Sequence, residues 1–515
     1  MKLSAFTLLC CGFCLLQTGW ESSIANAAET IPDRPEQLSY PPLQYEPPKA
    51  ADYRVQLHSG PVAFIIPDRE LPLVNIAIYV RTGEYLDPKG KEGLADLTGY
   101  LLARGGAGTN TAEQLEERLA FLAAQLNSGI GDVPVSGGGS VNVGNISLNL
   151  LSKDLDEGLV ILRDVLTSPH FQDDKITLRK QQLLQEMKQR NDDSAAIEGR
   201  EKGFLAFGEN FWANHYSTAA SIESITRGDL EAFHRAWFAP SNFIVAVSGD
   251  FDRKEMIAKL EKLFGNWPFA GHPAPSAPTN SSFAAPGVYL VDKPDVNQGR
   301  VSMLLPGIKR DNPDYFSVII MNDILGGGGF TSRVLNRVRS DEGLAYQAAT
   351  RFPGGVWFPL PFTALFQSKS RTVPYAISIV EDEMKKMAAA PVTEGELQIA
   401  KNAFIERFPR TFATKAQTAS VLAMEEFTGR AANDPEYYKN FRSNIAAVTA
   451  ADVQRVAQKY LTPEKLVILV VGNKADILLG HPNHPEKLTD FSSGKLVNLP
   501  LRDPLTMQPM NASAK

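Results

Sequence analysis

The chain has 515 residues, of which 43% are hydrophobic and 21% charged, and its formal net charge is −6 at pH 7. This composition is typical of a soluble globular protein, and the length exceeds what one hydrophobic core organises, so we expect more than one domain. The slightly acidic balance gives no support to nucleic-acid binding or to attachment to an anionic membrane surface.

The N-terminal residues predict a cleaved secretory signal peptide at residues 1–27. An apolar run extends from Leu3 to Leu16, and Ala25-Asn26-Ala27 has the small-x-small form of a cleavage site. The run is too short for a membrane anchor, because a spanning helix needs ~20 apolar residues, and no later segment is long and apolar enough. We therefore expect the mature chain to begin near Ala28.

The cysteines support an exported protein without disulfides. All three, Cys10, Cys11 and Cys14, lie inside the predicted signal peptide. A lipoprotein signal ending at Cys10 is the alternative, but Cys10 precedes most of the apolar run. A mature chain without cysteine forms neither disulfides nor thiolate zinc sites, and we predict a periplasmic location.

The predicted elements begin with a proline-rich arm at residues 28–50 and continue as a mixture of strands and helices. Apolar patterning predicts strands at 62–66, 74–80 and 136–150. Helical periodicity predicts helices at 93–103, 111–125, 155–166 and 173–191, the second of them capped by Thr111. Residues 268–286 are rich in proline, alanine and serine and predict a linker. The linker divides the chain into an N-terminal lobe (51–267), a C-terminal lobe (287–476) and a tail (477–515).

The two lobes contain similar segments. Residues 225–250 and 448–473 align without a gap, and Pro240 matches Pro463 at the same offset that pairs Leu102 with Leu325. Each segment predicts a capped helix, a proline turn and a buried strand that ends in glycine. One constant offset at two distant places indicates a duplicated unit.

These motifs and their order resemble the pitrilysin/insulinase-type zinc metallopeptidases over about residues 50–475. Gly93-Leu94-Ala95 resembles the sequence that precedes the family's zinc helix, residues 215–250 resemble the end of its zinc-bearing unit, and residues 325–346 resemble the signature of its second unit. The resemblance implies an α+β fold of two homologous lobes. Each lobe is then a pair of α/β repeats with an antiparallel-rich sheet covered by helices, and the lobes close on each other like a clam.

The zinc motif of that family, H-x-x-E-H, is absent here. The five corresponding positions are Asp96-Leu97-Thr98-Gly99-Tyr100, and only Glu186 resembles the third ligand, a glutamate on a later helix. A catalytic zinc needs about three protein ligands, so we predict no metal and no cofactor in this chain. The other interpretation of Glu186 is a solvated or salt-bridged helix residue. The histidines are scattered, and His481 and His484 lie between prolines that exclude a regular helix.

The second unit of the family supplies an arginine and a tyrosine to the substrate, and the resemblance places these at Arg339 and Tyr346. A guanidinium and a phenol aimed at a developing oxyanion stabilise it, so we predict catalytic roles for this pair. The resemblance also implies substrate binding by Gly328, Gly329 and Phe330. The alternatives are an exposed arginine with a core tyrosine, and glycines that serve close packing at a helix end. The glycine run matches no phosphate-binding motif.

The sequence therefore predicts the non-catalytic subunit of a heterodimeric zinc metalloendopeptidase, inactive alone. It is similar to the inactive subunits of bacterial heterodimeric peptidases and of the mitochondrial processing peptidase. The expected partner is a homologous H-x-x-E-H subunit that holds the zinc, and the expected substrates are unfolded peptides that add to a sheet edge. Two alternatives remain: a peptide-binding or scaffold protein without a role in proteolysis, and a self-sufficient hydrolase with an unrecognised site.

Overall fold

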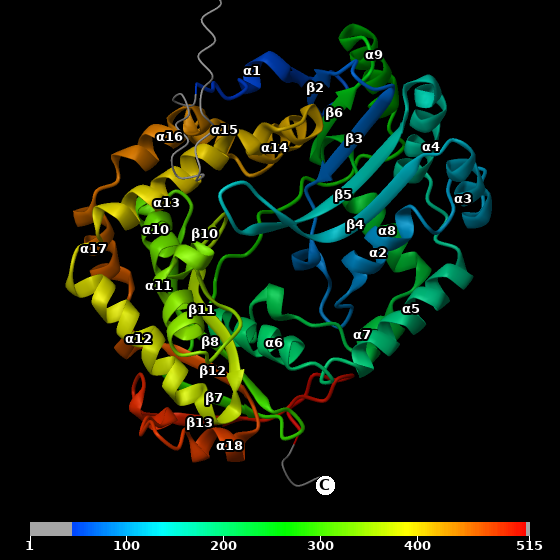
Figure 1. Ribbon diagram of the computed structural model, residues 1–515. Coiled ribbons are helices and arrows are strands. Elements are labelled where there is room, and N and C mark those ends of the chain that lie inside the picture. The colour runs from blue at the N-terminus through cyan, green and yellow to red at the C-terminus, as the bar shows by residue number, and fades with distance from the viewer. Residues whose placement is uncertain (1–43, 511–515) are drawn as a thin grey trace, which may run out of the picture. The chain divides into compact units, whose positions relative to one another are not determined.

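The computed structural model describes residues 44–510 (Figure 1). The predicted signal peptide and most of the proline-rich arm lie outside this range. The described residues form two mixed sheets with helices packed on them, which confirms the predicted α+β class. In the same range no helix combines the length and the apolar character that a membrane crossing requires.

The N-terminal lobe contains a six-stranded sheet in which β4 is an edge strand. The strands, in their order across the sheet, are β1 (Arg54–Gln56), β2 (Val62–Pro67), β6 (Phe243–Gly249), β3 (Leu73–Val80), β5 (Ser140–Leu151) and β4 (Gln125–Pro134). Only the β2–β6 pair is parallel, and the other pairs are antiparallel.

The second sheet has seven strands, six from the C-terminal lobe and β13 from the predicted tail (477–515), and β9 is an edge strand. Their order is β13 (Leu496–Leu499), β7 (Gly287–Asp292), β12 (Val467–Gly472), β8 (Gln298–Lys309), β11 (Leu360–Lys369) and β9 (Ala348–Arg351), and the short β10 (Gly354–Gly355) pairs with β8. The strands β6 and β12, which come from the duplicated segments, have equivalent neighbours. Each lies between one parallel and one antiparallel partner.

Helices follow the strands in both lobes. In the N-terminal lobe they are α1 (Ala50–Tyr53), α2 (Leu94–Leu102), α3 (Ala112–Phe121), α4 (Leu155–Thr167), α5 (Asp173–Lys188), α6 (Ser194–Phe207), α7 (Ala219–Ser224), α8 (Arg227–Trp237) and α9 (Arg253–Phe264). In the C-terminal lobe they are α10 (Tyr315–Asn322), α11 (Arg333–Leu335), α12 (Val373–Ala389), α13 (Glu394–Arg407), α14 (Lys415–Phe427), α15 (Arg430–Asn433), α16 (Tyr437–Ala447), α17 (Ala450–Tyr460) and α18 (Lys474–Leu479).

The duplicated helices α8 and α17 begin with the same capping box. Thr226 and Asp229 exchange side-chain to backbone hydrogen bonds at the start of α8, and Thr449 and Asp452 do so at the start of α17. Such a box satisfies two backbone N–H groups that the helix itself leaves unpaired. The local sequence therefore fixes where both helices start.

The prediction at residues 111–125 is wrong at its C-terminal end. The helix α3 begins at the expected cap, Thr111, but it ends at Phe121, and the chain then forms strand β4 from Gln125. The strand was missed because its sequence, QLNSGIGDVP, is rich in polar residues and glycine, which are poor strand formers by themselves. Pairing with β5 along its whole length holds it in the sheet.

Each half of the chain contributes one helix to the sheet of the other half. The helix α14 packs its apolar face, which includes Leu422 and Phe427, on Phe64 of β2 and Ile244 of β6. Conversely, α6 from the N-terminal lobe packs on the second sheet, against strands β7, β8 and β12. Figure 1 shows α14 beside β6 and α6 beside β8. Thus α14 completes the hydrophobic core on the first sheet, and α6 completes the core on the second sheet.

Candidate functional site

The helix α2 carries the five positions that correspond to the zinc motif. Its start is fixed by Asp87, whose carboxylate accepts the backbone N–H groups of Gly93 and Ala95, both at 2.8 Å. Gly93 adopts a left-handed φ of 100°, which favours glycine. The helix packs its buried face on the sheet core, and Asp96 and Tyr100 lie on its other side, toward α5.

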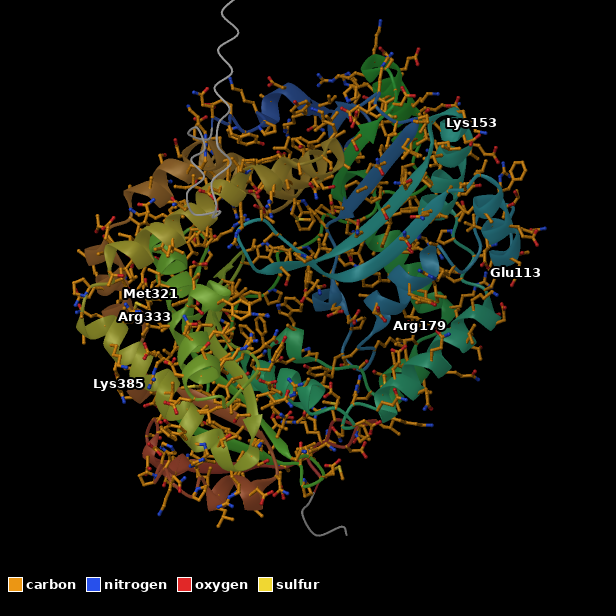
Figure 2. The ribbon with its side chains drawn as sticks, in the orientation of Figure 1. Glu113, Lys153, Arg179, Met321, Arg333 and Lys385 are labelled. Carbon is orange, nitrogen blue, oxygen red and sulfur yellow. The ribbon has the colours of Figure 1, made fainter. Side chains whose placement is uncertain are left out.

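Arg179 lies on α5 (Figure 2). Its guanidinium lies close to all three side chains at the ligand positions, Asp96, Tyr100 and Glu186. Its Nη1 is 3.0 Å from Oε1 of Glu186, and its Nη2 is 3.8 Å from Oδ2 of Asp96. Its Cζ lies 4.3 Å from the centre of the Tyr100 ring, and Arg104 stacks on the same ring at 4.5 Å. A protein cation is therefore placed where the ligands of a zinc ion would converge.

Electrostatics in this cluster favour a cationic neighbour. Burial raises the pKa of Asp96 and the nearby Glu186 carboxylate raises it further, whereas Arg179 lowers it. An opposite charge at short range stabilises the ionised carboxylate, so Arg179 offsets part of the cost of burying Asp96. Glu186 is salt-bridged, as the second interpretation of this residue expected.

The residues of the cluster do not fit a zinc ion. Two carboxylates and a phenol, without imidazole or thiolate, are a poor donor set for this metal. The guanidinium between them would also repel a divalent cation at this distance. In residues 44–510 no three metal-ligating side chains gather into a group that could hold an ion. Arg179 was not predicted from the sequence, although its spacing of seven from Glu186 places both on one helix face.

The position of the family's catalytic glutamate is closed by packing. A Cβ added to Gly99 would lie 2.4 Å from the backbone nitrogen of Ile130 and 2.7 Å from the carbonyl carbon of Gly129, both on β4. Ser128 of the same strand donates to the Gly99 carbonyl at 2.6 Å. The contact between α2 and β4 is therefore too close for any side chain at position 99.

A pocket of about 570 Å³ lies along the edge strand β4, next to this cluster. Its wall includes Gln125, Leu126 and Asn127 of β4, together with Tyr100 and Arg179. Because β4 is an edge strand, its outer backbone groups have no strand partner in the described sheet. The pocket therefore lies beside the start of an edge strand.

The structure brings together Arg339, Tyr346 and Phe330 of the C-terminal lobe. The Cζ of Arg339 lies 4.6 Å from the centre of the Tyr346 ring and 4.8 Å from that of Phe330. Tyr346 is 77% exposed and Phe330 is 69% exposed, so neither is a core residue. Arg339 forms part of a π-helical turn, Asn336–Asp341, and Tyr346 lies two residues before the edge strand β9. The guanidinium is thus held between two exposed rings near the edge strand β9.

In the glycine run Gly326–Gly329, Gly328 is closely packed, whereas Gly329 has open space around it. A Cβ at Gly328 would lie 2.8 Å from the Asp323 carbonyl oxygen, whereas Gly329 has a φ of +63° and nothing within 4 Å of a Cβ. Close packing, the alternative considered for these glycines, therefore applies to Gly328. Just beyond the run, Arg333 forms a bidentate pair with Glu396 of α13, at 2.6 and 2.9 Å, and ties the segment down.

Comparison with known proteins assigns this architecture. Residues 224–404 match the family model described as "Peptidase M16 inactive domain". An uncharacterized zinc protease of Streptomyces coelicolor is 24% identical over 61% of this chain and 68% of its own length. The mitochondrial-processing peptidase subunit beta of Lentinula edodes is 21% identical over 62% of this chain and 71% of its own length.

The solved structures agree. The crystal structure of a peptidase M16 inactive domain from Pseudomonas fluorescens has a TM-score of 0.70 and 23% identity, and the match covers 81% of this chain and 97% of that one. The chain is therefore similar to M16 peptidases, and it has the fold of the M16 inactive domain. The resemblance to the pitrilysin/insulinase-type peptidases is thereby confirmed.

The matched M16 inactive domain includes one of the two groups of residues described above. It contains the glycine run, Phe330, Arg339 and Tyr346, but it begins after α2 and after Glu186. The roles predicted for Arg339 and Tyr346, and for Gly328, Gly329 and Phe330 in substrate binding, stay predictions.

Proposed function

We propose that this M16 peptidase-like chain is the non-catalytic subunit of a heterodimeric zinc metalloendopeptidase. In this proposal Arg339 and Tyr346 bind the substrate and stabilise the transition state, and a homologous partner with H-x-x-E-H holds the zinc and the general base. The observation that carries the proposal is the exposed stack of Arg339 on Tyr346. Exposed aromatic rings that enclose an arginine are typical of binding sites, because tyrosine and arginine are enriched there.

The stack has the chemistry that the proposed role needs. No hydrogen bond is formed by the side chains of Arg339 and Tyr346 with other described residues, so their donors are free for a ligand. The two rings restrict the guanidinium and reduce the entropy that it loses on binding. A phenol and a guanidinium together offer donors to the oxyanion and to neighbouring peptide carbonyls.

The residues at the positions of the zinc motif support the proposal that the partner, and not this chain, holds the zinc. Arg179 fills the place of a cation, and the contact of Gly99 with β4 leaves no room for a general base. We therefore infer that this chain contains no zinc, and that the metal belongs to the partner. The pocket beside β4 would hold an extended peptide without cleaving it.

The first experiment identifies the partner. The full chain with a C-terminal tag is purified from its native host, and co-purifying proteins are identified by mass spectrometry. We expect a homologue with H-x-x-E-H, about one zinc per complex and none in the tagged chain after separation. About one zinc in the isolated chain, with peptide cleavage, would instead favour the self-sufficient hydrolase.

The second experiment tests the pair in that complex. Tyr346→Phe removes one donor and little volume, and we expect turnover to fall ~100–1000-fold. Arg339→Ala should also weaken substrate capture, because a guanidinium holds two acceptors at once. Arg410→Ala, another exposed arginine of the same lobe, is the control and should leave cleavage unchanged. Assembly is checked by gel filtration.

The alternative is a peptide-binding or scaffold protein derived from the peptidase fold. Full activity of both pair variants in an intact complex would favour it, as would purification without an H-x-x-E-H partner. Location is tested separately: we propose a periplasmic protein, and N-terminal sequencing should find the mature terminus near Ala28. A lipid-modified terminus at Cys10 would contradict this.

A further inference from the structure

A second pocket, of about 650 Å³, lies where the two lobes and the linker meet, away from the residues of the proposed function. Arg81 reaches it from the end of β3, Arg310 from the end of β8, and Arg430 from the start of α15. Five residues of the predicted linker form another wall: Ala274, Pro275, Ser276, Ala277 and Thr279. Three guanidiniums from distant parts of the sequence therefore converge on one cavity.

Arg430 is buried in this pocket with one donor unpaired. The residue is only 7% exposed. Its Nε is 3.1 Å from Oε2 of Glu425, its Nη2 donates to the Ser136 carbonyl at 3.1 Å, and its Cζ lies 4.1 Å from the centre of the Tyr437 ring. Its Nη1 is buried and has no hydrogen-bond acceptor within the described range.

Arg310 repeats this arrangement. Its Nη2 donates to the Thr428 carbonyl at 3.2 Å, and its buried Nη1 has no acceptor among the described residues. Burial lowers the pKa of Arg310, and the charge of Arg430 lowers it further. The two guanidiniums are thus near enough to repel each other, and each has one buried N–H group without an acceptor among the described residues.

The carboxylates near the pocket do not balance these charges. Glu425 pairs with Arg430, Glu426 pairs with Arg54 at 2.8 Å, and Asp311 pairs with Lys309 at 2.9 Å. The exposed Asp434 also lines the pocket, but the lining still has four cations against two carboxylates: Arg81, Lys309, Arg310 and Arg430 against Asp311 and Asp434. A buried N–H group without an acceptor costs free energy, and a bound anion that accepts from it would recover that cost. Guanidinium groups are well suited to this task, because they bind carboxylate and phosphate through two parallel hydrogen bonds.

We propose that this pocket is a binding site for an oxyanion, a carboxylate or phosphate group held by Arg310 and Arg430. Arg81 lies on the same wall and adds positive charge, although its own Nη1 already donates to the Phe427 carbonyl at 2.8 Å. Trp357 also lines the pocket and gives a flat apolar surface for the organic part of a ligand. Because Arg310, Arg81 and the linker come from different parts of the chain, the bound anion would join both lobes.

The test uses the mature protein and two anionic probes, inorganic phosphate and hippurate, titrated by isothermal calorimetry. Hippurate carries a carboxylate on an aromatic body, and hippuramide, its uncharged amide, is the ligand control. We expect saturable binding at one site per chain for at least one anion and none for hippuramide. Arg310→Gln should weaken that binding by about 10-fold or more. Arg253→Gln, which removes a surface arginine bonded to the Asp52 carbonyl, should bind as the wild type does.

The relative affinity of the two anions assigns the ligand class, phosphate or carboxylate. A second measurement does not depend on the stability of an arginine variant: binding should change tryptophan fluorescence, and Trp357→Phe should abolish the change. The absence of saturable binding of both probes by the wild type would overturn the proposal. Equal affinity in Arg310→Gln and wild type would overturn it as well, since the anion would then be bound elsewhere.

Discussion

Two residues, Arg179 and Gly99, prevent α2 from forming a zinc site. Arg179 supplies a positive charge among Asp96, Tyr100 and Glu186, so the acidic and aromatic groups are balanced without a metal. Gly99 lets β4 approach the helix so closely that its Cβ position overlaps backbone atoms of the strand. Substituting H-x-x-E-H at residues 96–100 would therefore not create a zinc site, because Arg179 would still lie among the ligands and β4 would still leave no space for a glutamate at position 99.

Gly99→Ala should destabilise the fold by roughly 2–3 kcal/mol, since the added methyl group meets backbone that cannot easily move. The matched control is Gly199→Ala, also inside a helix, where a Cβ has nothing within 4 Å. That change should be neutral or stabilising by up to about 1 kcal/mol, because alanine is the better helix former. Urea denaturation of both variants measures the difference, and equal stability of the two would show that β4 adjusts.

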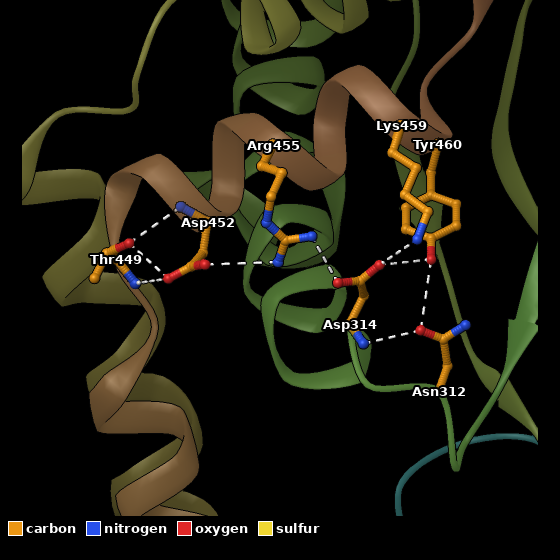
Figure 3. Close-up of polar contacts among 7 residues, drawn as sticks. All are labelled: Asn312, Asp314, Thr449, Asp452, Arg455, Lys459 and Tyr460. Atoms are coloured by element: carbon orange, nitrogen blue, oxygen red, sulfur yellow. Dashed lines mark hydrogen bonds and ion pairs between the residues drawn. The ribbon is translucent and has the colours of Figure 1, made fainter.

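At the scale of elements, a charged network joins α17 to the start of α10 (Figure 3). Asp314, only 6% exposed, accepts hydrogen bonds from Arg455 and Lys459 at 2.7 Å and from the Tyr460 hydroxyl at 2.8 Å. Burial acts to raise the pKa of Asp314, but the hydrogen bonds from Lys459, Arg455 and Tyr460 outweigh it and lower the pKa to about 2. These hydrogen bonds thus hold the duplicated helix α17 against the start of α10.

Asp314→Asn should lower the free energy of unfolding at pH 7 by about 1–3 kcal/mol, because charged hydrogen bonds are lost. The pH dependence follows from the depressed pKa of Asp314. The carboxylate stabilises the fold above its unfolded pKa of ~3.9, and this stabilisation is lost as the pH falls toward 2. The difference between variant and wild type should therefore shrink between pH 4 and pH 2. A constant difference across that window, measured by chemical denaturation, would contradict the assignment.

At the scale of the molecule, the reciprocal packing of α14 and α6 makes the two halves depend on each other. Without α14, the face of the first sheet that includes Phe64 and Ile244 would be exposed, and without α6 the second sheet would lose a similar cover. Exposed apolar patches of this kind promote association. The duplication thus yields two lobes that are similar in sequence but are not separate folding units.

We expect residues 51–267 and 287–510, expressed separately, to be unstable or aggregated. Co-expressed as two chains, they should associate into a soluble complex, because each then regains the helix that covers its sheet. Gel filtration and circular dichroism of the single and paired halves test this. Two monomeric, cooperatively folded halves would show that the exchanged helices contribute little to stability.

The sequence by itself determined the elements whose signals are local, and it determined what the zinc position lacks. Each duplicated segment, 225–250 and 448–473, contains both its capping box and the apolar run of its strand. Because these signals are local, the helices α8 and α17 and the strands β6 and β12 were predicted correctly. Tertiary structure alone decided the rest. Strand β4 exists because β5 pairs with it, and Arg179 and Gly99 acquire their roles from neighbours distant in sequence. Contacts of this kind leave no periodic pattern in the chain, because they depend on which surfaces the folded core brings together.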